Sequence, residues 1–379
     1  MKSIIGDYFR DHRSEMLQLL KLMVETESPT TEPHLANNMG ALVQDHLRAC
    51  GAAVTIDKQR HCGHHVIGRY GPQNEKKPIL LIGHLDTVWK EGTIDQRPFF
   101  INGDLAFGPG ALDMKAGLVI MLFALKAINA LSLVLQRPLT LVFNSDEEMR
   151  SEYSRELIFR EARHSNCALV FEGSNKLEAF TTSRNASGRF FVETHGKAAH
   201  AGAAIAQGVN AIEEMAYQVQ SLQRMTDLDV GTTVNVGIVS GGNRPNIVPD
   251  WAEAAVSVRA PTQREMDRIA RQVLGLQPVL KGASVRVRGN FHRGPFEPSH
   301  DNDQLFRELA MVASAFGLEV VGQHRGGASD ANLTSSVGTP TIDGMGAVGE
   351  GAHSADEHVQ ISSLGVRAAM ATELITRRA

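Results

Sequence analysis

Two hydrophobic patterns alternate along the first half of the chain and predict helices packed on a mostly parallel sheet. Segments with helical periodicity are separated by short runs rich in Leu, Ile and Val, as in α/β proteins. Three runs predict strands, at residues 78–82, 139–143 and 168–171, and lead into GHLDTV, NSDEE and EGS. In open α/β sheets the ligand crevice lies beyond the carboxyl ends of the strands. We therefore expect the His and carboxylate side chains of these segments to converge on one site.

The pattern changes from about Arg189 and predicts a second unit. Strands are expected in RFFVETHG, TTVNVGIVSGG, AEAAVSVRAP and ASVRVRGNF, with helices at residues 211–225 and 264–276. This βαββαβ order is typical of a ferredoxin-like fold. A helix at residues 301–316, a short strand in TPTIDGM and a C-terminal amphipathic helix then return to the first pattern. We expect an α/β domain at residues 1–184 and 295–379, with a ferredoxin-like α+β domain inserted at residues 185–294.

Length and composition are those of a globular protein of two domains. The chain has 379 residues, 42% of them hydrophobic and 21% charged, and a net charge of -4. This balance gives no reason to expect nucleic acid or an anionic membrane as a partner, so a small molecule is expected. Charged residues interrupt the N-terminal segment where an export signal needs an apolar core. Three cysteines, Cys50, Cys62 and Cys167, provide no disulfide framework, and we expect a cytoplasmic protein.

One long apolar stretch, AGLVIMLFALKAINALSLVL at residues 116–135, could be mistaken for a membrane span. Lys126 and Asn129 interrupt it. A helix buried against a sheet has the same hydropathy, and we expect such a helix.

Imidazole and carboxylate groups occur at the predicted strand ends and in the loops that follow: His84, Asp113, Glu147, Glu148, Glu172 and His353. Catalytic zinc sites use these ligands and keep one position open, and two ions can share a carboxylate. Asp86 lies two residues after His84 and could hold the ring nitrogen that does not bind metal. Asp113 follows the tight turn FGPGAL and is the candidate bridging ligand.

The adjacent Glu147 and Glu148 face different directions at a strand end, so we expect one to bind metal and the other to act as a base. The residues alone do not decide which. Taken singly, each of these polar groups is as readily explained as a solvated or capping residue. Their combination favours a metal centre.

The segments GHLDTV, GPGALDMKAG, NSDEE, VFEG and GEGAHSADEHV resemble, in order and spacing, the zinc aminoacylase and carboxypeptidase family. The chain looks most like the bacterial glutamate carboxypeptidases of the folate-cleaving type. The resemblance implies a two-zinc hydrolase that cleaves an amide bond adjacent to a free carboxylate. It further implies these roles: His84 and Glu148 on one zinc, Glu172 and His353 on the other, Asp113 bridging, Glu147 as general base and Asp86 orienting His84.

The inserted domain carries THGKAAHAG, SGGNRPNIVPD and SVRAP, which are similar to the lid of this family. The resemblance implies that His200 stabilises the oxyanion and that Asn246 and Arg259 hold the substrate carboxylate, with closure of the lid. It also implies a homodimer formed through this domain, in which His200 serves its own site or that of the neighbouring subunit. Arg293 is a further anchor candidate, with a plain surface arginine as the alternative.

Two further segments allow a structural and a functional interpretation. His61, Cys62, His64 and His65 could form another metal site, but they lie between AVTID and HVIGRY, and a hairpin turn is favoured. HRGGASDAN could approach a ligand, or it could be a helix entry with Ser329 or Asp330 as the cap.

The family usually has Pro where Trp89-Lys90 stands and Gly in place of Arg150 and Ala116. These departures bear on substrate preference more than on activity. Folate-type glutamates, N-acyl amino acids and dipeptides remain open as substrates. Zinc is the expected metal, with cobalt or manganese as alternatives. Two other functions also remain open: hydrolysis of a non-peptide C–N bond, ureido or aryl amine, and a non-catalytic binding protein.

Overall fold

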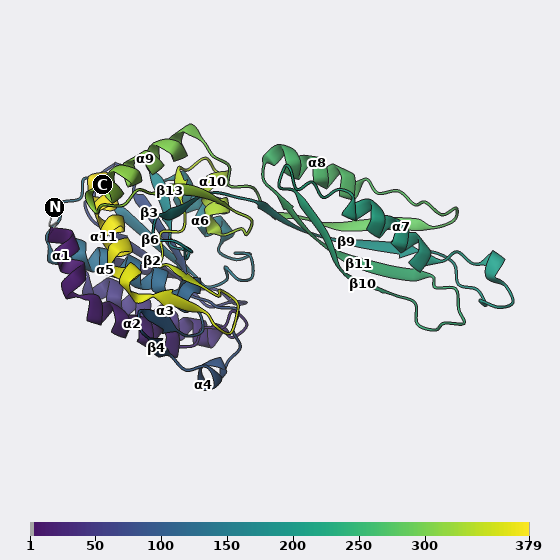
Figure 1. The fold of residues 1–379 in the computed structure, drawn as a ribbon, viewed down its shortest axis with the longest axis horizontal. Coiled ribbons are helices and arrows are strands. Elements are labelled where there is room, and N and C mark those ends of the chain that lie inside the picture. Colours follow the sequence, from purple (N-terminus) through teal and green to yellow (C-terminus); the bar gives the residue numbers. More distant parts are fainter. Residues whose placement is uncertain (1–3, 379) are drawn as a thin grey trace. The chain divides into compact units, whose positions relative to one another are not determined.

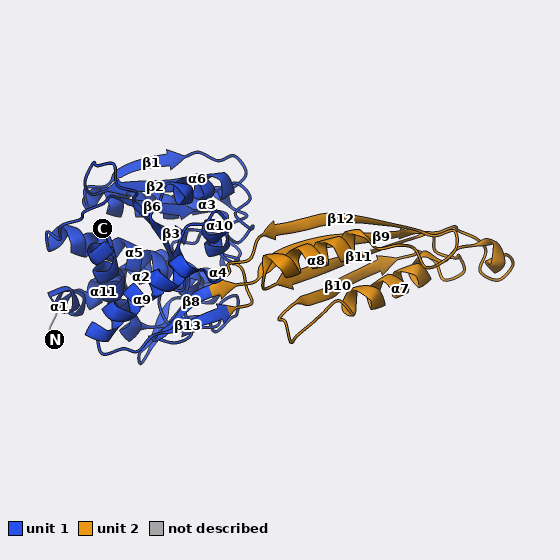
Figure 2. Cartoon of the chain, turned by 90° about the horizontal axis from the view of Figure 1, so that it is seen from above, with its two compact units in different colours: residues 1–182, 298–324, 329–379 blue, residues 183–297, 325–328 orange. Residues whose placement is uncertain are grey.

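The computed structural model describes residues 4–378. It divides into two compact units, coloured separately in Figure 2. Unit 1 comprises residues 1–182, 298–324 and 329–379, and unit 2 comprises residues 183–297 and 325–328. Unit 2 is therefore an insertion in the sequence of unit 1.

A six-stranded sheet forms the centre of unit 1. Its order is β1 (Ala53–Asp57), β2 (His65–Tyr70), β6 (Leu139–Asn144), β3 (Ile79–His84), β7 (Cys167–Val170) and β14 (Thr341–Ile342). The last four strands run parallel, and the β1–β2 hairpin adds an antiparallel edge. Because β3 and β6 are buried along their whole length, they read as continuous apolar runs. The predicted mostly parallel sheet is confirmed.

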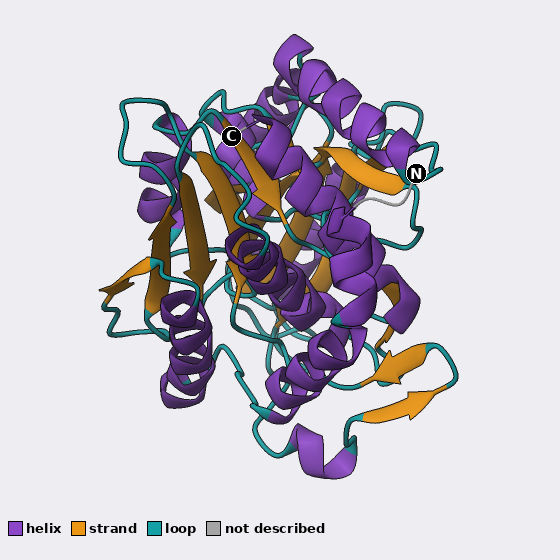
Figure 3. Cartoon of the chain, turned by 90° about the vertical axis from the view of Figure 1, so that its left-hand side faces the viewer, coloured by secondary structure: helices purple, strands orange, loops and turns teal. Residues whose placement is uncertain are grey.

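Helix α5 (Ala116–Ala130) packs on β3 and against α11 (Ile361–Arg378). It is apolar on nearly all sides because sheet and helices surround it. Within residues 4–378, no helix has the length and apolarity needed to cross a membrane. The other helices of unit 1 are α1 (Ile4–Asp11), α2 (Arg13–Glu25), α3 (Pro33–Ala49), α4 (Thr93–Gln96), α6 (Arg155–Arg163), α9 (His300–Ala315) and α10 (Asp330–Ser336). Figure 3 shows helices, in purple, packed beside the orange strands.

Smaller elements complete the chain. A four-stranded antiparallel sheet joins β15 (Gly349–Glu350), β16 (His358–Gln360), β5 (Leu105–Phe107) and β4 (Phe100–Asn102). A two-stranded sheet pairs β13 (Val321–Arg325) with β8 (Ala179–Arg184). The short helical turn η1 (Ala111–Lys115) leads directly into α5.

Unit 2 has the predicted βαββαβ order: β9 (Ala186–His195), α7 (Ala211–Gln223), β10 (Thr233–Gly241), β11 (Trp251–Ala260), α8 (Gln263–Leu274) and β12 (Ser284–Arg293). The turn η2 (Ile205–Gln207) lies between β9 and α7. The sheet order β10-β11-β9-β12 is antiparallel throughout, as in ferredoxin-like folds. Both helices cover the same face of the sheet, over a core that includes Phe190, Val256 and Ile269 (Figure 1). The opposite face carries no helix.

Candidate metal centre

Three parallel strands bring the predicted ligands of unit 1 to one edge of the sheet. His84 is the last residue of β3, and Glu172 follows β7 by two residues. Since β3 and β7 are hydrogen-bonded neighbours, His84 Nε2 lies 3.8 Å from Glu172 Oε1. The segment with Glu147 and Glu148 follows β6, the other neighbour of β3.

Asp113 lies in η1 between two groups of candidate ligands. One group is His84, Asp113 and Glu172, and the other is Asp113, Glu148 and His353; within each, one ligating atom per residue lies within 4.8 Å of the others. Asp113 Oδ1 lies 3.1 Å from His84 Nε2, and Oδ2 lies 3.0 Å from His353 Nε2. Each carboxylate oxygen therefore faces a different group, which is the arrangement of a bridging ligand.

The grouping corrects the pairing that the family resemblance implied. His84 is grouped with Glu172, not Glu148, because their strands are direct neighbours. Glu148 lies four residues beyond the end of β6 and is 3.4 Å from His353 Nε2. Glu147 belongs to neither group. The structure therefore distinguishes the adjacent glutamates: Glu148 is grouped with candidate metal ligands, and Glu147 is not.

Asp86 contacts more than the imidazole of His84. The nearest acceptor to His84 Nδ1 is the Asp86 backbone oxygen at 2.9 Å, while the Asp86 carboxylate lies 3.5 Å away. This carboxylate accepts hydrogen bonds from the backbone N–H groups of Glu147 and Glu148, each at 3.2 Å, and from the Thr30 hydroxyl at 2.8 Å. Asp86 therefore positions both glutamates as well as the end of β3.

Glu357 is a positioning residue that the sequence analysis did not identify. Its buried carboxylate accepts hydrogen bonds from the backbone N–H groups of Gly110, Leu112 and Asp113, at 2.8, 2.9 and 3.0 Å. Its second partner on Oε2 is the indole N–H of Trp89, at 2.9 Å. Glu357 thus fixes the turn that presents Asp113. The only available signal was its place in GEGAHSADEHV.

The electrostatics of the centre favour a cation. The Asp113 and Glu148 carboxylates, as acceptors for the ring N–H of His353, raise the pKa of His353 to about 10. Burial raises the pKa of Glu148 to about 7 and, together with the charge of Asp113, raises that of Glu172 well above its usual value. Burial opposes protonation of His84, yet hydrogen bonds to Asp113 and Asp86 raise its pKa well above its usual value. In this structure the buried negative charge of the carboxylates is neutralised by bound protons. Divalent cations bound at the same place would neutralise it instead.

The donor set also fits two such ions. Two imidazoles and three carboxylates are the nitrogen and oxygen ligands of zinc and similar metals. Glu148 Oε1 is a buried oxygen whose polar contact among residues 4–378 is the ion pair with His353 Nε2 at 3.4 Å. An acceptor of this kind is costly unless a cation or donor satisfies it.

In unit 2, His200 is exposed and its ring orientation is fixed by the backbone. Its Nδ1 accepts hydrogen bonds from the N–H groups of Gly202 and Ala203, at 3.1 and 3.2 Å. The neutral ring therefore carries its proton on Nε2 and presents a hydrogen-bond donor. Asn246 is close by, because its backbone oxygen accepts from Ala201 N at 3.1 Å.

Arg259 and Arg293 lie at the other end of the same sheet. Both are paired in register with Ser187 of β9, Arg259 from β11 and Arg293 from β12. Residues paired in register share a face, here the face without helices, because the alternate residues of β11, such as Val258, form the core. Arg259 Nη1 donates to Ser187 Oγ at 2.6 Å. Arg293 is 5% exposed, which excludes the alternative of a plain surface arginine.

The structure favours the structural interpretation of HRGGASDAN. Ser329 is the N-cap of α10, where its side chain accepts from Ala331 N and Asn332 completes a capping box. Asp330 is buried and accepts from the side-chain amide of Asn144 at 2.8 Å. The segment is a helix entry packed beside β6.

The His-rich segment is the predicted hairpin loop, since β1 and β2 pair antiparallel on either side of it. Two of its histidines are engaged elsewhere: His61 stacks on Tyr153, and His64 Nδ1 accepts from the Gln59 N–H. Cys62 and His65 are buried.

Two departures from the family pattern have structural consequences. The guanidinium of Arg97 covers one face of the Trp89 ring, 3.8 Å from its centroid, so that face is not open for stacking. Arg150 has φ 73°, a conformation that favours glycine, which explains why the family usually has glycine there.

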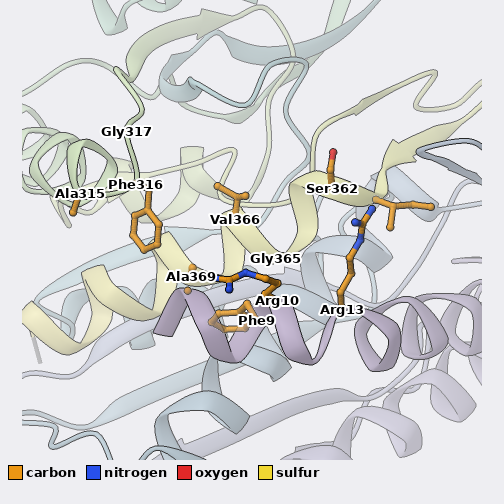
Figure 4. Close-up of a pocket in the computed structure, with 12 residues that line it drawn as sticks. Phe9, Arg10, Arg13, Ala315, Phe316, Gly317, Ser362, Gly365, Val366 and Ala369 are labelled. Atoms are coloured by element: carbon orange, nitrogen blue, oxygen red, sulfur yellow. The ribbon is translucent and has the colours of Figure 1, made fainter. Parts of the chain in front are cut away.

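A separate cavity of about 620 Å³ lies among α1, α9 and α11 (Figure 4). Phe9, Phe316 and Val366 line it, together with Arg10 and Arg13. Both arginines are paired, with Asp7 and Asp104 respectively. None of the candidate metal ligands borders this cavity.

The chain is similar to known hydrolases over nearly its whole length. Residues 80–377 match peptidase family M20/M25/M40. Carboxypeptidase G2 of Pseudomonas sp. (strain RS-16) is 31% identical over 377 residues, covering 96% of this chain and 89% of that protein. The solved aminopeptidase PepT of Bacillus cereus has a TM-score of 0.79 at 20% identity, covering 96% of this chain and 98% of the other.

The YXEP protein of Bacillus subtilis, described as a dinuclear metal binding peptidase, has a TM-score of 0.72 at 13% identity, covering 97% and 99% of the two chains. The two structural likenesses show the fold. The family match and the identity with carboxypeptidase G2 confirm the resemblance found in the sequence motifs. The chain therefore belongs to peptidase family M20/M25/M40 and is an enzyme of the metallopeptidase class.

Proposed function

We propose that this enzyme hydrolyses an amide bond adjacent to a free carboxylate, with two metal ions bound in unit 1. The observation that carries the proposal is the sharing of Asp113 between the group of His84 and Glu172 and the group of Glu148 and His353. Zinc is the proposed metal, because imidazole and carboxylate ligands suit it, with cobalt or manganese as alternatives. When bound, the metals would supply Lewis acidity to the scissile carbonyl and to the attacking water.

Glu147 is the proposed general base. Its side chain is 9% exposed, it lies next to Glu148 in the sequence, and its backbone is held by Asp86 at 3.2 Å. A carboxylate fixed there and not committed to either ligand group can take the proton of the attacking water and return it to the departing amine. Residues 1–184 and 295–379 would form the catalytic domain.

The substrate carboxylate is proposed to bind at the row formed by Arg259, Ser187 and Arg293. Two guanidinium groups on the same face of this sheet carry the planar donors that a carboxylate pairs with. This anchor suits a C-terminal glutamate or an N-acyl amino acid, and the relative named carboxypeptidase G2 is consistent with a substrate that ends in a free carboxylate. The inserted domain, residues 185–294, would act as the lid.

His200 and Asn246 are proposed to act on the site of a second subunit. They lie near Trp251, where β11 begins, whereas Arg259 lies at its other end. Strands rise about 3.3 Å per residue, so the eight steps of β11 from Trp251 to Arg259 separate them by about 26 Å. One copy of this rigid sheet cannot bring both ends to one small substrate, which favours a homodimer with His200 as the oxyanion donor.

Amide hydrolysis by wild type and Glu147→Ala, each with quantified metal, tests the reaction. The panel contains N-acyl amino acids, dipeptides and folate-glutamate conjugates, each with a matched amide that lacks the carboxylate. We expect the wild type to hydrolyse only the substrates that carry the carboxylate. Glu147→Ala should still bind metal, but its turnover should be lower by orders of magnitude. Turnover of ureido or aryl-amine substrates alone would refute the amide assignment, and metal binding without any turnover would indicate a binding protein.

Mixed dimers test the role of His200. Glu147→Ala and His200→Ala subunits are each expected to be inactive alone. If His200 acts across the interface, random mixing restores about a quarter of wild-type activity, because half of the dimers then hold one complete site. No recovery, with dimer exchange verified by mass, would place His200 in its own subunit's site. The cytoplasmic location stays a prediction.

A further inference from the structure

A second cluster of ligand-type side chains lies outside the proposed catalytic centre. It consists of Cys62 in the β1–β2 loop, His65 at the start of β2 and Asp146 just beyond β6. One ligating atom from each lies within 4.8 Å of the other two. Their exposed fractions are 1%, 0% and 0%. The cluster shares no residue with the two groups around Asp113.

Two atoms of this cluster are buried without a hydrogen-bond partner in residues 4–378: His65 Nε2 and Asp146 Oδ1. The other polar atoms of the same side chains are engaged. Asp146 Oδ2 accepts from Tyr153 N at 2.7 Å and from Ser154 N at 3.2 Å, and His65 Nδ1 lies 3.2 Å from Ser145 Oγ. A buried polar atom left unsatisfied costs about 1–3 kcal/mol. Two of them in one cluster therefore favour binding of a ligand at this position.

The surroundings of His65 allow Nε2 to bind it once the ring proton moves. Ser145 N donates to His65 Nδ1 at 3.3 Å, which places the proton of the unligated neutral ring on Nε2. Ser145 Oγ donates to the backbone oxygen of Gly63, so its lone pairs can accept from a proton on Nδ1. In the bound form the proton therefore resides on Nδ1, and Nε2 presents a lone pair. Gly63 makes the close packing possible, since a Cβ there would lie 2.6 Å from Ala36 Cβ and 3.1 Å from Ser145 Cβ.

Charge and donor type identify the class of ligand. A thiolate and a carboxylate with a neutral imidazole carry two negative charges, which one divalent cation neutralises. Such a neutral assembly can be buried, whereas an unpaired charge cannot. Sulfur and imidazole donors favour zinc or cobalt over magnesium or calcium.

We propose that Cys62, His65 and Asp146 form a third metal site, structural in role, that binds zinc or cobalt. Binding forms a metal–sulfur bond and releases the thiol proton of Cys62 to solvent. The ion would join the hairpin loop to the residue that directly precedes Glu147. The inference does not depend on the proposed reaction, because it concerns residues outside the catalytic groups.

Cobalt titration of the full-length, metal-depleted protein tests this site. A thiolate bound to cobalt gives an intense near-ultraviolet charge-transfer band, and no ligand proposed around Asp113 contains sulfur. We expect three ions per chain in wild type, with this band saturating at one equivalent. Two ions and no sulfur band would overturn the proposal and leave a bridging water as the satisfying group.

Variants assign the band to this cluster. The Cys50→Ala/Cys167→Ala protein keeps Cys62 as its only cysteine and must retain the band. Cys62→Ala must lose the band and one ion while binding the other two. If Cys62→Ala does not fold, His65→Gln decides the matter, since it keeps the thiol but removes a ligand and must weaken cobalt binding at this site at least tenfold. A band that persists unchanged in either cluster variant would overturn the assignment.

Discussion

Replacement of Glu357 by Gln tests whether one buried carboxylate fixes the turn that carries Asp113. Oε1 accepts from Leu112 N and Asp113 N, and Oε2 accepts from Gly110 N and from Trp89 Nε1. The amide of Gln replaces one oxygen by an NH2 group, so two N–H donors lose their acceptor in either orientation. At about 1–3 kcal/mol for each unsatisfied buried donor, the loss is roughly 2–6 kcal/mol before relaxation.

Urea unfolding of the metal-depleted protein measures this loss without a contribution from bound ions. Glu350→Gln is the matched control, because Glu350 lies in the same segment but is exposed. Its effect should stay within about 0.5 kcal/mol, as for most surface substitutions. Metal affinity should also fall in Glu357→Gln, since Asp113 is no longer held in place. A free energy of unfolding that matches the control would refute the reasoning.

Three further outcomes are expected. Burial and nearby Glu15 raise the pKa of Tyr8 to about 12. The neutral form of Tyr8 therefore stabilises the fold below pH 10, and this contribution fades as the pH rises toward 12. In urea unfolding, Tyr8→Phe should remove that part of the pH dependence. Raised pKa values at Glu148 and His353 mean that the metal-free protein binds more protons folded than unfolded, so its stability should fall from about pH 5 to 10, and zinc should abolish this slope. Arg293→Gln should raise KM for carboxylate substrates at least tenfold while kcat falls much less.

The candidate ligands could be predicted from the sequence because each follows an apolar run that could only be a buried strand. His84, Glu147 and Glu172 lie at or beyond the ends of β3, β6 and β7, and the carboxyl ends of parallel strands meet at one edge. The order of these strands within the sheet could not be predicted from the apolar runs. Because β3 lies between β6 and β7, the grouping of His84 with Glu172 became visible only in the structure.

The residues whose roles depend on tertiary packing could not be predicted from local sequence patterns. Glu357 holds a turn 244 or more residues earlier in the chain, and no local pattern marks a carboxylate that accepts from distant N–H groups. Arg293 presented a similar difficulty, since its burial depends on how β12 pairs with β9. The hairpin loop was predicted from its flanking strands, but Asp146 joins Cys62 and His65 only through tertiary packing.

Four consecutive residues after β6, residues 145–148, link the hairpin cluster to the two glutamates of the candidate metal centre. Ser145 and Asp146 face the hairpin cluster, whereas Glu147 and Glu148 are held through their N–H groups by Asp86. The segment is thus held from two sides, by a carboxylate that also contacts His84 and by the hairpin loop, whose Gly63 oxygen accepts from the Ser145 hydroxyl. Because a general base is effective only when its position is fixed, loosening the hairpin should lower kcat through Glu147 while the ligand groups around Asp113 still bind metal. The Cys62→Ala protein measures this directly, since its loss in kcat should exceed that of Cys50→Ala at equal occupancy of the catalytic centre.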